Sequence, residues 1–406
     1  MRSSRAFLIR ASLIGFTFLL MGWCLPAYAQ RVNQLDGSID VGGGVNDYPT
    51  NIGQGESSNW ESFYNISPAA TLSSKTARSV LSLSYAFGWN YYGSELARHS
   101  TSHTASLGVS RKLSQRWSVR VSDNYTRTND IQTFYALRGV AIEEEGLVVY
   151  FYPVTTATAI GTNYLNVAFD HSFSAKSTLS FGATHTFGNY GASQSPLLGL
   201  SDLQTISVNA TYTRRLNERT SWNLAYNGSH FTFDKFNSAV STSATVGLTY
   251  TLAKETSVNV SAGPSRVDNL NIPGSNTTLA VTASIAKTIK RNSFHASLSN
   301  NNATTSGVGT VSNTRSAAAG VSRALNRRVN VFADFSLFDG AGVAGNPFRT
   351  RGTSATANMG YSLARNLSLQ GGLQYQRFTQ PSPYAYTQRR LFVSLRYSHP
   401  NLWRSH

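Results

Sequence analysis

Residues that could support catalysis or bind a metal are scattered along the chain rather than grouped in motifs. No G-x-S-x-G or H-E-x-x-H sequence occurs, so neither a hydrolase nucleophile elbow nor a zinc-protease helix is indicated. Cys24 is the single cysteine, which excludes a C-x-x-C site. We therefore predict that the protein is not an enzyme and that it has no catalytic, metal or cofactor site.

Six charged residues stand in or beside segments in which apolar and polar residues alternate. In a strand, the polar positions of such a segment share one face. If the strands surround a lumen, these side chains face inward, and an excess of arginine there favours anions. The candidate pore-lining residues are Arg116, Arg120, Asp170, Asp334, Arg390 and Arg396.

A second candidate region is the longest interval between alternating segments, roughly residues 128–159. It holds the largest acidic cluster of the chain, followed by an apolar stretch rich in aromatic residues. An acidic loop opposite basic wall residues would create a transverse field, and aromatic side chains could stack on sugars; an extended hairpin packed on other loops is the alternative. The residues concerned are Glu143, Glu144, Glu145, Tyr150, Phe151 and Tyr152.

The elements that must position these residues show a period of two. Leu81, Leu83 and Tyr85 alternate with Ser82 and Ser84, and the same pattern recurs over residues 243–252, 367–376 and 390–397. This period predicts strands with one apolar and one polar face. We find no convincing amphipathic helix after residue 30, so the predicted fold class is all-β.

The strands are predicted to pair around eight short polar turns. Successive turns are about 36 to 41 residues apart, with one interval of about 60, and longer loops rich in Gly, Asn, Ser and Pro lie between them. Short turns at one end and long loops at the other are typical of a transmembrane up-and-down β-barrel. The turns are Ser74-Lys75-Thr76, Ser114-Gln115-Arg116, Ala175-Lys176, Asn217-Glu218-Arg219, Lys254-Glu255, Lys290-Arg291-Asn292, Asn326-Arg327-Arg328 and Arg365-Asn366.

Eight turns define sixteen strands, and two terminal segments complete the predicted count. One segment near Asp36–Val45 and one near Gln388–Ser398 bring it to about eighteen. Sixteen is the alternative if the glycine-rich first segment does not pair.

Composition excludes several other classes of protein. Only 13% of the residues are charged, whereas 41% are hydrophobic and 12% aromatic. This charge is low for a cytoplasmic enzyme, and the aromatic content is high for a disordered chain. Lysine and arginine are spread along the chain, which argues against a nucleic-acid partner.

The first 29 residues have the pattern of a cleaved secretory signal peptide. Arg2, Arg5 and Arg10 precede an apolar stretch, and the small-x-small motif Ala27-Tyr28-Ala29 follows it. Residues 30–406 are then a single barrel domain that contains no cysteine. It carries 32 basic and 19 acidic residues, a net charge of +13.

The repeated hairpins and the last strand carry a resemblance to a known class. The segment Leu391–Tyr397 resembles the aromatic-ended terminal strand of Gram-negative outer-membrane β-barrels, and the chain as a whole resembles those of the porin type. The resemblance implies outer-membrane lipid, the barrel-assembly machinery and, in some members, further copies of the chain as partners. Residues Ser398–His406 follow that strand, so either Tyr397 or Trp403 could act as its terminal aromatic residue.

The resemblance also implies a function. It suggests a cofactor-free channel, with short periplasmic turns and longer extracellular loops, for passive diffusion or export of small polar or anionic solutes or saccharides. In general porins the third long loop narrows the channel, which here is the loop of residues 128–159. The hairpins are also similar to those of the β-barrel porins associated with exopolysaccharide export, so a secretion conduit and a plugged structural or adhesive barrel remain alternatives.

Overall fold

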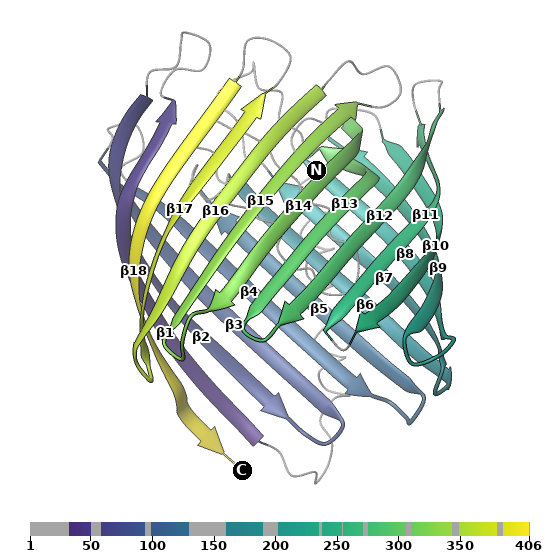
Figure 1. Ribbon diagram of the computed structural model, residues 1–406, viewed down its shortest axis with the longest axis horizontal. Helices are drawn as coiled ribbons and strands as arrows, with labels where there is room; N and C mark the ends of the chain where they lie inside the picture. The colour runs from purple at the N-terminus through teal and green to yellow at the C-terminus, as the bar shows by residue number, and fades with distance from the viewer. Residues whose placement is uncertain are drawn as a thin grey trace, which may run out of the picture.

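The protein is a closed barrel of antiparallel strands (Figure 1). The computed structural model describes residues 32–49, 58–93, 99–129, 160–189, 202–234, 238–253, 255–270, 275–305, 310–342, 349–379 and 385–405. The described strands form an 18-stranded sheet in which β1 (Val32–Pro49) pairs with both β2 (Ser58–Lys75) and β18 (Ala385–Ser405). The predicted barrel of eighteen strands is confirmed, and the count of sixteen is wrong because the glycine-rich β1 pairs along its whole length.

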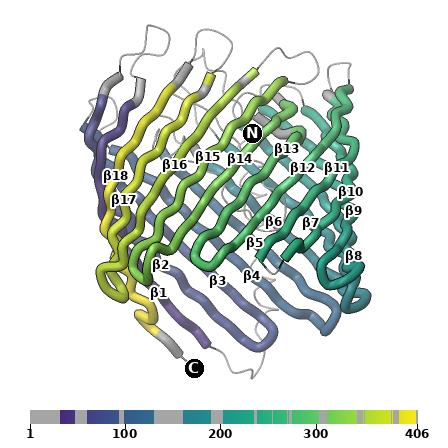
Figure 2. Tube along the Cα trace, viewed as in Figure 1, coloured from purple at the N-terminus to yellow at the C-terminus, as the bar shows by residue number. Residues whose placement is uncertain are grey.

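The strands follow one another around the barrel in chain order and cross it obliquely (Figure 2). No helix long and apolar enough to cross a membrane occurs in the described ranges. The predicted signal peptide lies outside the described residues. The remaining strands are β3 (Ser79–Tyr92), β4 (His99–Lys112), β5 (Trp117–Thr128), β6 (Ile160–Ser174), β7 (Ser177–Asn189), β8 (Leu203–Arg215), β9 (Thr220–Phe233), β10 (Ala239–Ala253), β11 (Thr256–Asn269), β12 (Ser275–Ile289), β13 (Asn292–Thr305), β14 (Thr310–Ala324), β15 (Val329–Gly342), β16 (Arg349–Ala364) and β17 (Leu367–Thr379).

The short connections all lie at one end of the barrel, and polar side chains shape several of them. Asn326 Oδ1 accepts hydrogen bonds from the backbone N–H groups of Arg328 (2.7 Å) and Val329 (2.9 Å) in the β14–β15 turn. Asn217 Oδ1 accepts one from Arg219 N–H (2.9 Å) in the β8–β9 turn. Such side-chain-to-backbone bonds stabilise tight turns, which explains why a few polar residues suffice to reverse the chain.

The last residues of the chain extend the barrel wall rather than leaving it. The tail continues β18 to Ser405, and its pairing with β1 is interrupted by one irregularity between Leu35 and Gly37. Asn401 lies at this irregularity with φ of 61°, and its backbone N–H donates to Asp36 Oδ1 at 2.7 Å. The tail therefore helps to close the seam between the first and last strands.

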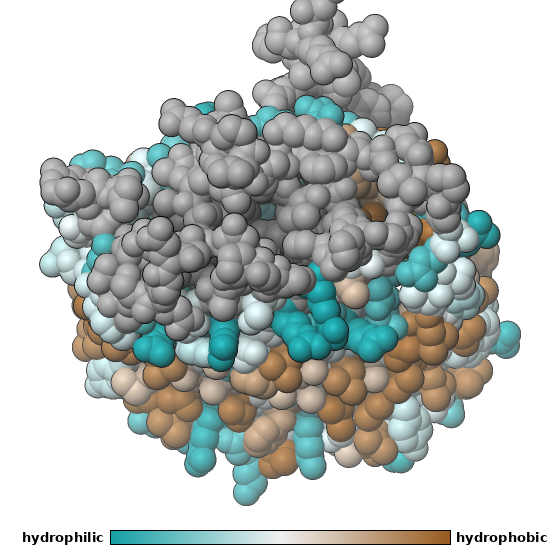
Figure 3. Space-filling view, turned by 90° about the horizontal axis from the view of Figure 1, so that it is seen from above, coloured by the Kyte–Doolittle hydropathy of each residue, from teal (hydrophilic) through white to brown (hydrophobic). Residues whose placement is uncertain are grey.

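The barrel is apolar on the outside, as the alternation predicts. Outward positions hold large hydrophobic side chains that stay exposed, such as Val246 at 60% and Leu298 at 59%. Figure 3 shows hydrophobic side chains gathered in a band along the visible side of the barrel, with hydrophilic ones above and below it. The buried apolar cluster lies instead at the long-loop ends of the strands: Leu203, Phe231, Phe233, Ala239, Val267 and Val311.

Candidate functional site

The inner face of the barrel is built mainly from small polar side chains. The register places Ser84 opposite Ser106 on β3 and β4, away from the exposed Leu83 and Tyr85. Hydrogen bonds link such side chains from strand to strand, as in Ser207–Ser229 (2.8 Å), Ser299–Ser316 (2.6 Å) and Asn166–Thr184 (2.9 Å). Serine and threonine carry hydroxyl groups on short side chains. This lining is therefore hydrophilic and occupies little of the interior.

Arg120 and Asp170 meet on the inner face, where alternation predicts them. Arg120 Nη2 lies 3.2 Å from Asp170 Oδ1. Ser118 on β5 and Ser180 on β7 stand opposite Asp170 and donate hydrogen bonds to its two oxygens, at 3.1 and 2.7 Å. The carboxylate is thus held from both neighbouring strands, whereas half of the Arg120 side chain remains exposed.

Asp334 on β15 forms a second inward pair, with a residue two strands away. His295 Nε2 on β13 lies 3.0 Å from Asp334 Oδ1. Gly320 on β14 stands between them, opposite both residues in the register. A Cβ atom at this position would overlap both side chains, so the glycine gives the room in which the pair forms.

Arg390 and Arg396 on β18 also face inward, beside β1. The Arg390 guanidinium lies 4.1 Å from the centre of the buried Phe63 ring, a cation–π contact. Arg396 stands opposite Asp40, which also accepts a 3.4 Å hydrogen bond from Ser394 Oγ. Arg390 therefore lies against the barrel wall, and Arg396 has an acidic neighbour.

The sequence places Arg116 both in a predicted turn and among the candidate pore-lining residues, and the structure has it in the turn. It lies in the turn between β4 and β5, because β5 begins only at Trp117. Ser114 Oγ accepts hydrogen bonds from the backbone N–H groups of Arg116 and Trp117, both at 3.1 Å. This bonding ends the alternation before Arg116, so its direction cannot be read from the pattern of β5.

The predicted loop residues are outside the part of the chain that the structure describes. These are Glu143, Glu144, Glu145, Tyr150, Phe151 and Tyr152, which fall between β5 and β6. Their role, like the part of the inward arginines in conduction, stays a prediction.

The described inner wall does not carry the predicted excess of positive charge. Away from the short turns and the chain end, three arginines face inward, and five acidic residues share this face. The arginines are Arg120, Arg390 and Arg396, and the acids are Asp36, Asp40, Glu61, Asp170 and Asp334. Most basic residues lie instead in the short turns or on the outer face, so the net charge of the chain says little about the interior.

Some inward residues were missed by the sequence reasoning. Asp40 and His295 stand between apolar neighbours, so alternation could have identified both. Phe63 and Tyr164 could not be found in this way, because each is a large apolar or aromatic residue at a polar position of its strand. Tyr164 is 46% exposed and offers an aromatic surface to the interior.

Grouped metal ligands are absent from the described ranges: no three His, Cys, Asp or Glu side chains lie together. The histidines occupy both faces. His295 faces inward, whereas His171 packs on the outward Trp117 with ring centres 4.3 Å apart. This aromatic packing near the short-turn end suits a membrane interface.

Comparisons with known proteins agree with this architecture. No protein-family model matches the sequence, and no curated protein matches it significantly. Among solved structures, Pseudomonas aeruginosa OccK7 (OpdD) is similar with a TM-score of 0.50 and 11% identity, over 93% of this chain and 100% of that one. P. aeruginosa OccK2 (OpdF) is similar with a TM-score of 0.50 and 11% identity, over 90% and 98%.

A second structure of OccK2, in complex with glucuronate, has a TM-score of 0.50 and 10% identity over the same shares of the two chains. At these identities the similarity shows the fold, and the architecture matches in its all-β composition and closed antiparallel sheet. The chain therefore has the closed antiparallel barrel fold of these porin-type structures.

Proposed function

We propose that this barrel is a passive channel of the Gram-negative outer membrane for small polar solutes, with uncharged sugars as the best-fitting class. The observation that carries the proposal is the inner face, where short hydroxyl and amide side chains hydrogen-bond along the wall. Barrels of sixteen to eighteen strands are wide enough to hold an aqueous channel, unlike eight-stranded ones. A neutral hydrophilic lining lets a sugar replace hydrogen bonds to water with hydrogen bonds to the wall at little cost in free energy.

The charges of the wall favour weak ion selectivity over the predicted anion preference. Asp170 is held by Arg120 and two serines, and Asp334 lies beside His295. Five acids face three arginines on the described inner wall, so no belt of basic side chains surrounds the solute path there. Tyr164 adds an aromatic surface of the kind on which sugar rings stack.

The outer face supports the membrane placement. Large apolar side chains alternate outward along the strands and remain exposed, as expected of a surface that faces lipid. In outer-membrane barrels the short turns face the periplasm and the long loops face outward. We assign the same orientation here. The described strands offer no feature that favours the export or adhesive alternatives.

The test is conduction by the full-length mature protein reconstituted in planar bilayers and in liposomes. We expect steady openings, little reversal potential under a salt gradient, and faster liposome swelling in glucose than in glucuronate. A variant that lacks residues 140–155 tests whether the acidic loop narrows the channel. If it does, the variant has a higher conductance than the full chain. A folded barrel that conducts neither as the full chain nor without this loop would overturn the proposal.

A further inference from the structure

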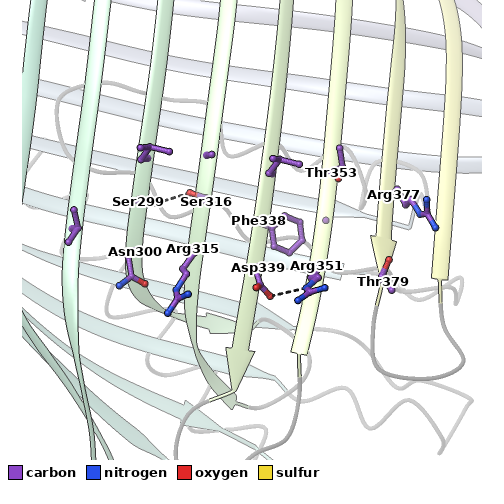
Figure 4. A pocket seen from close by; sticks show the side chains of 15 residues that line it. Ser299, Asn300, Arg315, Ser316, Phe338, Asp339, Arg351, Thr353, Arg377 and Thr379 are labelled. Atoms are coloured by element: carbon purple, nitrogen blue, oxygen red, sulfur yellow. Dashed lines mark hydrogen bonds and ion pairs between the residues drawn. The ribbon is translucent and has the colours of Figure 1, made fainter.

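A groove on the outer face of the barrel lies near the long-loop ends of β14–β17. It measures about 650 Å³. Figure 4 shows Arg315, Asp339 and Arg351 side by side on three neighbouring strands, with Arg377 on the next strand. The register gives these residues the same direction as the exposed Leu337 on β15. They therefore project away from the interior and belong to a different surface from the inner wall.

The groove has a strong excess of positive charge. Arg349 binds Asp339 with two hydrogen bonds, Nε to Oδ1 at 3.0 Å and Nη2 to Oδ2 at 2.7 Å, and Arg351 Nε lies 3.6 Å from the same carboxylate. Arg315 and Arg377 line the groove as well. Four arginines thus surround one acid, and the loops of residues 306–309, 343–348 and 380–384 that join these strands contain no acidic residue.

The other part of the groove is apolar. Leu298, Ala317 and Leu337 line it next to the arginines, and both leucines are exposed. About ten residues along β15 separate Asp339 from Val329 at the short-turn end. With a rise of about 3.3 Å per residue and a tilt of about 40°, the arginines lie roughly 25 Å above that end, which is about the height of the lipid-facing band.

A ligand that fits this groove needs anionic groups at the outer edge of the apolar band and hydrocarbon below them. Guanidinium groups bind phosphate by paired, charge-assisted hydrogen bonds. We propose that the groove binds the phosphorylated headgroup of an acylated glycolipid of the outer leaflet, the chemistry of lipid A. The phosphates contact Arg315, Arg351 and Arg377, and the acyl chains lie over Leu298 and Leu337. This proposal rests on the membrane orientation assigned above and adds a lipid partner to it.

The experiment measures lipid retention by the reconstituted full-length barrel in phosphatidylcholine nanodiscs, read by native mass spectrometry. The probes are diphosphoryl lipid A, the same lipid without phosphates, and inorganic phosphate as a millimolar competitor. The test variant combines Arg315→Gln, Arg351→Gln and Arg377→Gln and keeps the Arg349–Asp339 pair. A control of equal charge change combines Arg127→Gln, Arg266→Gln and Arg323→Gln, which are outward residues of other sites.

We expect the wild type and the control to retain diphosphoryl lipid A, and the test variant to lose at least about ten-fold in affinity, because three charge contacts disappear. Equal retention by the test variant, or an equal loss in the control, would overturn the proposal. So would displacement by inorganic phosphate, which would indicate a free-anion site. If the triple variant does not fold, Arg377→Gln alone gives a smaller loss in the same assay.

Conductance of the same preparations separates this proposal from the channel function. The groove faces away from the interior, so both sets of variants conduct like the wild type. Lipid retention without conductance would contradict the channel and leave the lipid site standing. Conductance without phosphate-dependent retention would contradict the lipid site alone.

Discussion

The inner and outer faces of the same strands hold their charges in different ways. On the inner face, Asp170 is bound by side chains from both neighbouring strands, and Asp334 is bound across Gly320 by His295. On the outer face, arginines gather at one level of β14–β17 around the single carboxylate of Asp339. Inward charge is therefore dispersed and paired, whereas at this outward site the charge is concentrated and mostly basic.

The difference follows from what each face contacts. A charge beside hydrocarbon is costly unless it reaches the headgroup level, so outward arginines are placed at the end of the apolar band. A charge beside a water-filled interior carries no such cost and can be placed along the wall, where a nearby opposite charge keeps the field weak. The placement of charge thus follows the surroundings of each face, lipid outside and water inside. Substitutions can test each assignment.

The largest expected effect is on stability, when an arginine is placed on the outer face and compared with an arginine on the inner face. Val246 lies at the centre of β10 and faces outward, and the adjacent Thr245 faces inward. We expect Val246→Arg to lower the free energy of unfolding by about 2–4 kcal/mol and Thr245→Arg to cost less than about 1 kcal/mol, because only the first meets hydrocarbon. Urea titration of the barrel in lipid vesicles measures both. Equal costs would mean that the faces are assigned wrongly.

Separating His295 from Asp334 should have the next largest effect on stability. A Cβ at Gly320 would overlap Asp334 and His295, so we expect Gly320→Ala to lower the free energy of unfolding by about 1–3 kcal/mol. Gly108, on the inner face of β4, has open space around it and provides the matched control. Gly108→Ala should be neutral or slightly stabilising in the same titration. A loss at Gly108 equal to that at Gly320 would contradict the role given to the pair.

Neutralising single charges should have the smallest effect, on ion selectivity. A unit charge about 10 Å from an ion in water changes its energy by about 0.4 kcal/mol, or roughly two-fold in occupancy. We therefore expect Asp170→Asn to shift the permeability ratio toward anions, and the double variant Arg120→Gln with Arg396→Gln to shift it toward cations. Arg351→Gln, on the outer face, should leave the reversal potential unchanged. A shift with Arg351→Gln as large as with Asp170→Asn would remove the distinction between the faces.

Much of the fold could be predicted because it depends on local patterns. Alternation along a strand sets which side chains share a face, and short polar turns mark where the chain reverses. These two signals were enough for the all-β class, the eighteen strands and the inward direction of Arg120, Asp170, Asp334, Arg390 and Arg396. Arg116 lies in the turn that the sequence predicts and not in the wall, because the hydrogen bonds of Ser114 hold the residue there.

The sequence by itself determined the faces of each strand, because the period of two is a property of a single segment. Only the tertiary structure decided which residues meet across strands. His295 reaches Asp334 because the register places Gly320 between them, and Arg315, Arg351 and Arg377 share one groove although more than 60 residues separate the first from the last. Register depends on pairing along whole neighbouring strands and on closure of the barrel, so no local pattern contains it.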